Sequence, residues 1–236
     1  MERIILIETS TSLCSTALAE NGEIAAYRES SAPKAHASLT AVFIQEMLAE
    51  RGICLKDCDA VCVSMGPGSY TGLRVGVSTA KGLCFGSGLP LIAVGTLDTL
   101  VAQAVDSSLA GDEVKHIVPM IDARRMEVYT AVFERDTTNQ NNWKQTTETA
   151  PEIIDENSFA DLLEEGPVLF IGDGAGKCAD VIKHPNARFE QCWPEASSMM
   201  TPAIKAYEEK RFEDVAYFEP FYLKEFVATV SKKKMW

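Results

Sequence analysis

The hydrophobic positions in the first hundred residues predict strands that alternate with helices. Short aliphatic runs of four to eight residues, bounded by turn residues, are typical of buried strands. Asn21-Gly22 separates two of these runs and favours a tight β-hairpin. The predicted strands of this half are residues 3–9, 14–20, 23–30, 60–65 and 91–94.

Helices are predicted where apolar residues recur at helical spacing. Residues 39–51 follow Ser38, which we expect to cap the helix, and precede Gly52, which we expect to end it. A second helix is predicted over residues 71–87, and a third begins near Thr96.

The second half of the chain resembles the first. The predicted strands 116–121 and 127–133 flank Asp122, just as the first two strands flank Glu8, and the two acids are separated by close to half the chain. A duplicated unit is the simplest account, and chance similarity between short strands is the alternative. The remaining predictions are a polar, hairpin-like stretch at 136–150, helices at 157–164, 174–183 and 197–211, a strand at 168–171, and a frayed basic end at 231–234.

Composition excludes several classes of function. The 236 residues contain 22 Lys+Arg and 34 Asp+Glu, which gives a net charge of −12. This charge argues against a free-standing nucleic-acid-binding protein and against docking on an anionic membrane. The first apolar run is short and is followed at once by Glu8, so we expect a strand rather than a secretory signal. We therefore expect a cytoplasmic protein whose seven cysteines are reduced.

Metal chemistry has little support in the sequence. Cys54, Cys58 and Cys62 have the spacing C-x3-C-x3-C, but structural zinc needs a second ligand pair, and none follows. We interpret the three thiols as small buried hydrophobic groups. The three histidines are not spaced as a ligand pair on one helix face.

Two glycine-rich turns follow predicted strands. The segment Gly172–Lys177 fits neither the Walker motif nor G-x-G-x-x-G, so phosphate binding and a simple tight turn stay open. Glu8 and Asp122, at the ends of strands, either hold a ligand or cap the following turn. In the other turn, Ser69 lacks the setting of a nucleophile, and Ser69 or Thr71 is a predicted N-cap. The candidate nucleotide-binding residues are Glu8, Thr9, Ser10, Gly172, Asp173 and Gly174.

The helices predicted at 39–51 and 71–87 carry more apolar surface than one core needs. The second helix also contains several glycines, which destabilise a helix unless another backbone must approach closely. We therefore predict that both helices bind a partner protein, and the alternative is that both are enclosed by their own chain. The predicted partner-facing residues are Leu39, Val42, Phe43, Ile44, Met47, Leu48, Leu73, Gly76, Val77 and Ala80.

Five segments resemble the TsaB (YeaZ) family, and the resemblance covers essentially the whole chain. The most specific is the glycine-rich signature Gly66-Pro-Gly-Ser-Tyr-Thr-Gly-Leu-Arg-Val-Gly76. The others, in the expected order, are Ile7-Glu-Thr-Ser10, Ile121-Asp-Ala-Arg-Arg-Met-Glu-Val-Tyr129, Gly172-Asp-Gly-Ala175 and Pro220-Phe-Tyr-Leu-Lys224.

The resemblance implies an α/β protein with a duplicated actin-like ATPase (ASKHA, ribonuclease H-like) fold. Its lobes are expected at residues 1–105, with the partner-binding helices, and 106–236. The family role implied is that of a non-catalytic subunit in the transfer of a threonylcarbamoyl group to the adenosine next to the anticodon of tRNAs that read ANN codons.

The resemblance also implies the partners. The chain is expected to bind and activate TsaD, to be joined by the ATPase TsaE, to meet tRNA only through the complex, and to form a homodimer when alone. TsaD holds metal through H-x-x-x-H, whereas here His36 is followed by Thr40. Metal and ATP or ADP are therefore expected in the partner subunits, with at most weak nucleotide binding here. The alternatives are a small-molecule kinase or nucleotide-binding protein of the actin-like superfamily and, less favoured, a metallopeptidase.

Overall fold

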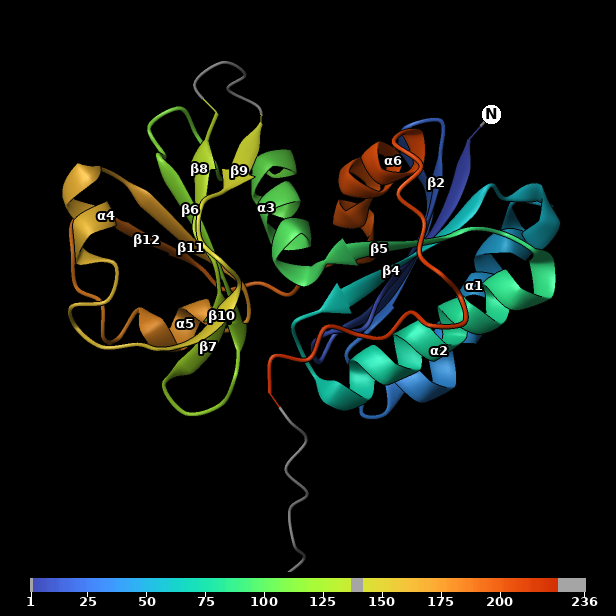
Figure 1. Ribbon diagram of the computed structural model, residues 1–236, viewed down its shortest axis with the longest axis horizontal. Coiled ribbons are helices and arrows are strands. Elements are labelled where there is room, and N and C mark those ends of the chain that lie inside the picture. Colours follow the sequence, from blue (N-terminus) through green and yellow to red (C-terminus); the bar gives the residue numbers. More distant parts are fainter. Residues whose placement is uncertain (1, 137–141, 225–236) are drawn as a thin grey trace, which may run out of the picture.

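The chain forms two lobes that lie side by side (Figure 1). We describe it from a computed structural model that covers residues 2–136 and 142–224. Each lobe contains a mixed β-sheet, and helices pack against the sheets. Among the helices of these residues, none has both the length and the apolar character needed to cross a lipid bilayer.

The sheet of the first lobe is centred on strand β1. β1 pairs antiparallel with β2, placing Ile5 opposite Leu18, and parallel with β4, placing Ile5 opposite Val61. Asn21 and Gly22 both have positive φ angles in the turn between β2 and β3, as the hairpin prediction requires. In spatial order the strands are β3 (Glu23–Ser30), β2 (Cys14–Glu20), β1 (Arg3–Glu8), β4 (Ala60–Gly66) and β5 (Leu91–Gly95).

The sheet of the second lobe repeats this arrangement around β6. β6 pairs antiparallel with β7 and parallel with β11, as β1 does with β2 and β4. The predicted duplication is thereby confirmed, because strand order and strand directions agree in the two lobes. In spatial order the strands are β10 (Ala150–Ile153), β7 (Glu127–Thr130), β6 (His116–Asp122), β11 (Val168–Ile171) and β12 (Ala187–Glu190), with β8 (Phe133–Arg135) and β9 (Trp143–Gln145) extending from β6.

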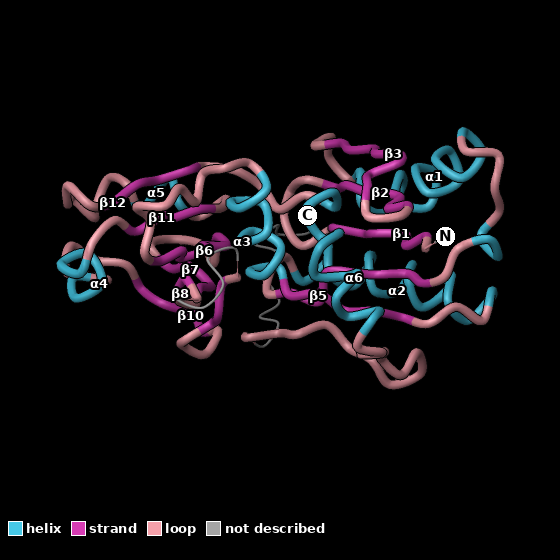
Figure 2. The backbone as a smooth tube through the Cα atoms, turned by 90° about the horizontal axis from the view of Figure 1, so that it is seen from above, coloured by secondary structure: helices cyan, strands magenta, loops and turns pink. Residues whose placement is uncertain are grey.

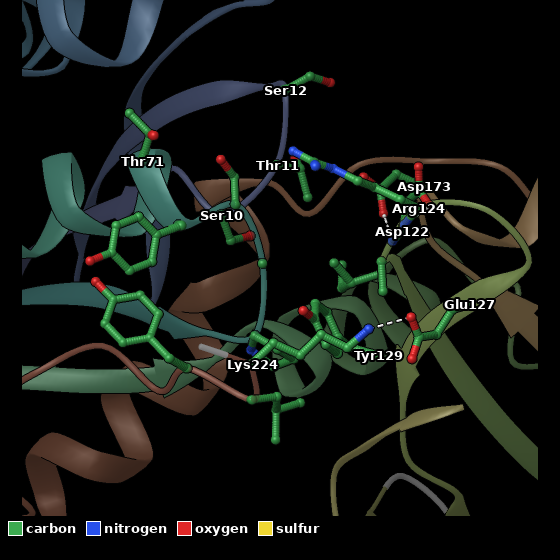
Figure 3. A pocket seen from close by; sticks show the side chains of 18 of the residues that line it. Ser10, Thr11, Ser12, Thr71, Asp122, Arg124, Glu127, Tyr129, Asp173 and Lys224 are labelled. Carbon is green, nitrogen blue, oxygen red and sulfur yellow. Dashed lines mark hydrogen bonds and ion pairs between the residues drawn. The ribbon is translucent and has the colours of Figure 1, made fainter. Parts of the chain in front are cut away.

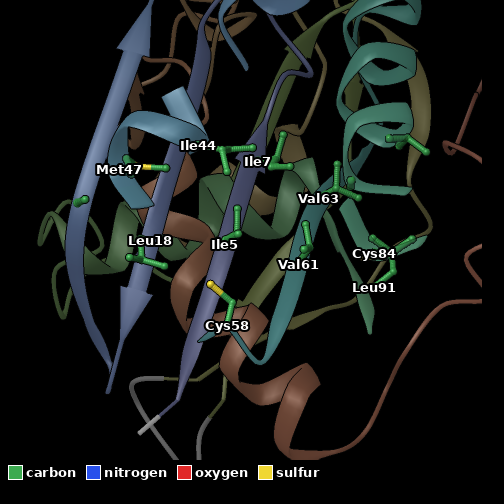
Figure 4. Close-up of a cluster of buried hydrophobic side chains, with 13 residues drawn as sticks. Ile5, Ile7, Leu18, Ile44, Met47, Cys58, Val61, Val63, Cys84 and Leu91 are labelled. Carbon is green, nitrogen blue, oxygen red and sulfur yellow. The ribbon is translucent and has the colours of Figure 1, made fainter. Parts of the chain in front are cut away.

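Helices α1 (Ala35–Glu50) and α2 (Tyr70–Ser87) cover one face of the first sheet. Their inner residues form a cluster with the aliphatic side chains of β1, β2 and β4 (Figure 4). The opposite face is covered by the 3-10 helix η2 (Ala196–Met199) and by α6 (Met200–Glu208). The view from above shows α6 beside the strands of this lobe (Figure 2). The first sheet is therefore buried on both faces, which explains why its strands are continuous aliphatic runs.

The last helices of the two predicted lobes, residues 1–105 and 106–236, pack across the junction between the lobes. Helix α3 (Thr96–Asp106) packs its apolar face against β6 and β11 of the second lobe. It also contacts η2, α6, β4 and β5 of the first lobe. Helix α6, near the other end of the chain, instead packs on the first lobe. The chain then stays with the first lobe, because Phe221 N donates to Met65 O at 2.7 Å and Lys81 Nζ donates to Phe218 O at 2.9 Å. The core of the first lobe is thus completed by segments from near the other end of the chain.

Some predicted helix bounds need correction. Helix α1 begins at Ala35, so Ser38 lies inside it and is not its cap; Ser38 Oγ donates back to Lys34 O at 3.1 Å. Ala35 is buried, so tertiary packing rather than a side-chain cap holds the first turn. The prediction for α2 is confirmed, and Ser69 Oγ accepts a hydrogen bond from Gly72 N at 3.3 Å as its N-cap.

The second lobe departs further from the predictions. The strand expected at 127–133 is broken into β7 and β8, which pair with different neighbours. The helix expected at 174–183 is the four-residue α5 (Ala175–Cys178), and that expected at 197–211 is divided between η2 and α6. Helix α4 (Ala160–Glu165) is shorter than predicted, while β12 and η1 (Leu55–Asp57) were not anticipated. The predicted basic end at 231–234 lies outside the described residues.

Candidate functional site

A cleft of about 860 Å³ lies between the lobes (Figure 3). The first lobe contributes the turn after β1 and the segment that leads into α2. The second lobe contributes the turn between β6 and β7 together with Asp173, and the end of the chain adds Phe221–Lys224. Of the candidate nucleotide-binding residues, the structure brings Ser10 and Asp173 to this cleft.

The turn after β1 is held tightly against the start of α2. Ser69 N donates to Ser10 O at 2.6 Å, and Thr9 Oγ1 donates to Gly72 O at 2.9 Å. A Cβ atom on Gly72 would lie 2.1 Å from Thr9 O, and one on Gly76 would lie 2.2 Å from Thr9 Oγ1. The glycines of the signature therefore permit close approach of backbones within this chain. Thr9 is buried at this contact and does not line the cleft.

Glu8 does not line the cleft but is buried beneath it. Its Oε1 accepts a hydrogen bond from Ser10 N at 2.6 Å, whereas its Oε2 has no partner among the described residues. Burial raises the pKa of Glu8 to about 7, and the hydrogen bonds of Ser10 offset this only in part. Glu8 therefore stabilises the turn locally and has no direct access to a ligand in the cleft.

The two aspartates of the second lobe do come together. Asp173 Oδ1 accepts a hydrogen bond from Asp122 N at 2.9 Å, and burial raises the pKa of Asp173 to about 6. The Asp122 carboxylate forms an ion pair with Lys177 and also accepts a hydrogen bond from Arg124 N. Asp122 is thus engaged by its own turn, as the turn-capping alternative predicted.

The glycines of the segment 172–176 form a tight turn rather than a phosphate cradle. Gly172 N donates to Glu190 O at 3.1 Å, and Gly174 N donates to Met120 O at 2.9 Å. Gly172 has φ of 130°, which favours glycine, and a Cβ there would lie 2.3 Å from Met120 O. Since both N–H groups already have acceptors, the prediction that Gly172 and Gly174 bind nucleotide is not supported by their geometry.

Sequence reasoning missed the basic residues of the cleft. Arg124 and Arg125 form the turn between β6 and β7 with φ of 73° and 53°, a conformation in which glycine or asparagine is usual. Lys224, at the other side of the cleft, pairs with Glu127 and lies over the Tyr129 ring. The available signal was a pair of consecutive arginines in the short segment between two predicted strands.

The predicted partner-facing residues divide into two groups. Val42 is 41% exposed, and Leu39, Phe43 and Leu48 are half-buried. The others face the interior of their own lobe and are not available to a partner, because helical spacing alone does not say which stripe meets the sheet. These buried residues are Ile44, Met47, Leu73, Gly76, Val77 and Ala80.

Histidine, cysteine and carboxylate side chains do not gather as a metal site in residues 2–136 and 142–224. Cys58 and Cys62 are buried, as expected, and burial raises the pKa of the Cys58 thiol to about 11. Cys54 is exposed, so the interpretation as a buried residue is wrong for this cysteine. It is the N-cap residue of the short helix η1.

Two lobes with equivalent sheets around a central cleft define a duplicated actin-like fold. Two crystal structures of Pseudomonas aeruginosa proteins share it: one is described as YeaZ, the other as similar to the peptidase YeaZ. Each superposes with a TM-score of 0.81 at 24% identity, covering 94–95% of this chain and all of the other.

Comparison of sequences identifies the family. The family model of TsaD, tRNA N6-adenosine threonylcarbamoyltransferase, matches residues 29–230. The tRNA threonylcarbamoyladenosine biosynthesis protein TsaB of Escherichia coli is 33% identical, with 96% of each chain covered. The Haemophilus influenzae protein of the same name is 29% identical, covering 94% of this chain and 93% of its own. The chain belongs to the TsaB family, whose members are named for tRNA threonylcarbamoyladenosine biosynthesis.

Proposed function

We propose that this chain is a non-catalytic subunit of the threonylcarbamoyl-transfer complex and that it binds and activates TsaD. The complex transfers a threonylcarbamoyl group to the adenosine next to the anticodon of tRNAs that read ANN codons, and this chain meets tRNA only within the complex. TsaD supplies the transfer chemistry and the metal, and TsaE supplies ATP hydrolysis. The proposal rests on membership of the family together with one surface of the first lobe.

That surface, the α1–α2 surface, is the outward side of these two helices, which pack beside each other (Figure 1). Phe85 is 88% exposed and Val42 is 41% exposed. Gly82 and Gly86, one helical turn apart, have open space where a Cβ would lie. A solvent-exposed phenylalanine beside two glycines is unfavourable on a helix that faces water. The same arrangement allows close packing against a helix of another subunit. This exposed Phe85–glycine strip is the observation that carries the proposal.

The non-catalytic role is supported by the contacts of three polar side chains, which are satisfied or enclosed within this chain. Asp122 is ion-paired with Lys177, and Glu8 is enclosed beneath the cleft. Thr40 stands where the second histidine of the TsaD motif would fall, and its Oγ1 donates to His36 O at 2.6 Å. The same α1–α2 surface would be available for homodimer formation when TsaD is absent.

The substitution Phe85→Glu is expected to weaken binding to TsaD by about a hundredfold, because it places a charge in an apolar contact while leaving the core of the first lobe untouched. Pull-down and calorimetric titration with purified TsaD measure this. Threonylcarbamoyladenosine formation, reconstituted with TsaD and TsaE, should fall in parallel when this subunit is kept at low concentration.

Ile153→Glu is the matched control, since Ile153 is 74% exposed but belongs to the second lobe. It should bind TsaD as the unmodified chain does. Ile44→Glu is unsuitable because Ile44 is buried, and its loss of binding would only report unfolding. Unchanged TsaD affinity in a folded Phe85→Glu variant, or full tRNA modification without this subunit, would contradict the proposal.

A further inference from the structure

Strand β10 lies at an edge of the second sheet, and one of its sides is open. It pairs antiparallel with β7, placing Ile153 opposite Glu127, and it has no other strand neighbour in the described part of the chain. On the β7 side, Ile154 N donates to Met126 O at 2.8 Å. Because backbone groups alternate in direction along an antiparallel strand, the N–H and C=O of Ile153 point to the open side, together with the C=O of Pro151. These groups are available to a further strand.

A groove of about 450 Å³ lies along this edge. Its lining includes the apolar side chains of Phe159 and Leu162, and it includes three carboxylates, those of Glu148, Glu152 and Asp161. The lining has no lysine or arginine, and none of the three acids forms an ion pair within residues 2–136 and 142–224. Burial raises the pKa of Glu152, as expected for a carboxyl group that lacks a nearby cation. The groove therefore fits an extended segment that carries both apolar and basic residues.

The last described residues bring the chain to this part of the sheet. Lys224 forms an ion pair with Glu127 and lies over the Tyr129 ring, 5.8 Å from its centroid (Figure 3). Glu127 and Tyr129 belong to β7, where they lie opposite Ile153 and Pro151 of β10. Since neighbouring strands are about 4.8 Å apart, the strand with the open edge lies about one strand spacing beyond the contacts of Lys224.

The sequence that follows, residues 225–236, has the composition that the edge and the groove require. Phe226-Val-Ala-Thr-Val230 is rich in aromatic and β-branched residues, which favour strands. Three consecutive lysines come next, at residues 232–234, and they equal the unpaired acids of the groove in number. Twelve extended residues span about 40 Å, whereas the four residues of β10 span about 13 Å. The segment is therefore long enough to follow the whole edge.

We propose that residues 226–230 add to the open side of β10 as an antiparallel strand, and that the lysines at 232–234 bind the carboxylates of the groove in the same chain. The direction follows from Lys224, which places the start of the segment at the Ile153 end of β10. The segment then runs toward Glu148, which precedes β10, so the lysines arrive beside this acid. Main-chain hydrogen bonds provide the attachment, and side-chain contacts with the groove select the segment. This inference does not depend on the proposed role beside TsaD.

Amide hydrogen exchange of the full chain, followed by NMR, tests the added strand. The Ile153 N–H should exchange at least about tenfold faster in Ala228→Pro than in the unmodified chain, because proline lacks an N–H group and interrupts a paired strand. Ala228→Ser keeps the N–H group and is the matched control, which should retain the slow exchange. The amides of β12, the strand at the opposite edge of the sheet, should exchange equally in all three proteins. Equal Ile153 exchange in all three would overturn the proposal.

Carbodiimide coupling, which joins an ammonium group directly to a carboxylate, tests the charged contacts. In an equal mixture of ¹⁵N-labelled and unlabelled chains, mass spectrometry should find the lysines at 232–234 joined to Glu148 or Glu152 of the same chain. Glu156 is the control acid, because it is exposed and does not line the groove, and it should couple at least about tenfold less. Coupling that joins only labelled to unlabelled chains would assign the groove to a second copy and overturn the proposal. Coupling to Glu156 at an equal yield, or no coupling to the groove, would also overturn it.

Discussion

Replacing Gly72 with alanine is expected to destabilise the protein by about 3 kcal/mol, although alanine normally stabilises a helix. The added Cβ would lie 2.1 Å from the carbonyl oxygen of Thr9, which belongs to the rigid turn after β1. Relief requires moving either the start of α2 or the turn, and both are anchored by the hydrogen bond from Ser69 N to Ser10 O. The damage should extend to the cleft, because that turn lines it.

Gly82→Ala in the same helix is the matched comparison and should have the opposite sign. Nothing lies within 4 Å of the Cβ position of Gly82, so the variant should gain up to about 1 kcal/mol from helix propensity. Chemical denaturation of both variants measures the free energies of unfolding. Equal effects from the two substitutions would show that the turn does not press on α2 as described.

Stability should fall by about 3 kcal/mol as the pH rises from 5 to 8, because of Glu8. Burial raises the pKa of this carboxyl from its ordinary value of 4.5 to about 7 in the folded state. Between these two values the folded state binds a proton that the unfolded state has lost, so folding is favoured at low pH. That advantage disappears as Glu8 ionises through its folded pKa. The shift corresponds to about 3 kcal/mol.

The substitution Glu8→Gln should remove the larger part of this fall, leaving a flatter pH profile and a more stable protein at pH 8. A smaller fall should remain, because burial also raises the pKa of Asp173, to about 6. Denaturation curves of both proteins at several pH values between 5 and 8 provide the measurement. Glu156→Gln, at an exposed glutamate of the second lobe, is the control and should keep the slope of the unmodified protein. A slope in Glu8→Gln as steep as that of the unmodified protein would place the main titrating group elsewhere.

Local sequence patterns predicted much of the fold. The hairpin at Asn21-Gly22 and the aliphatic strands of both lobes depend on neighbouring residues, and the structure has them at the predicted places. The repeat around Glu8 and Asp122 was likewise visible, because each acid follows an equivalent buried strand. The glycine-rich signature indicated the family for a related reason, because Gly68, Gly72 and Gly76 each lie against the turn after β1, where a Cβ would not fit.

The candidate site was predicted less well than the fold. Glycines after a strand are compatible with phosphate binding and with a tight turn, and only the acceptors of Gly172 N and Gly174 N distinguish the two. In the sequence, Arg124 looks like an ordinary turn residue. Only the structure shows that its side chain points across the cleft (Figure 3).

By itself, the sequence determined the strands, the hairpin, the duplicated arrangement of strands and the family. Each of these features depends on patterns among residues that are close together in the chain. Tertiary structure alone decided that α3 and α6 pack across the junction between the lobes, that Ile44 and Met47 face inward while Phe85 faces outward, and that Glu8 is enclosed. These outcomes depend on packing between segments that are far apart in sequence. An apolar stripe along a helix does not specify which surface it will pack against.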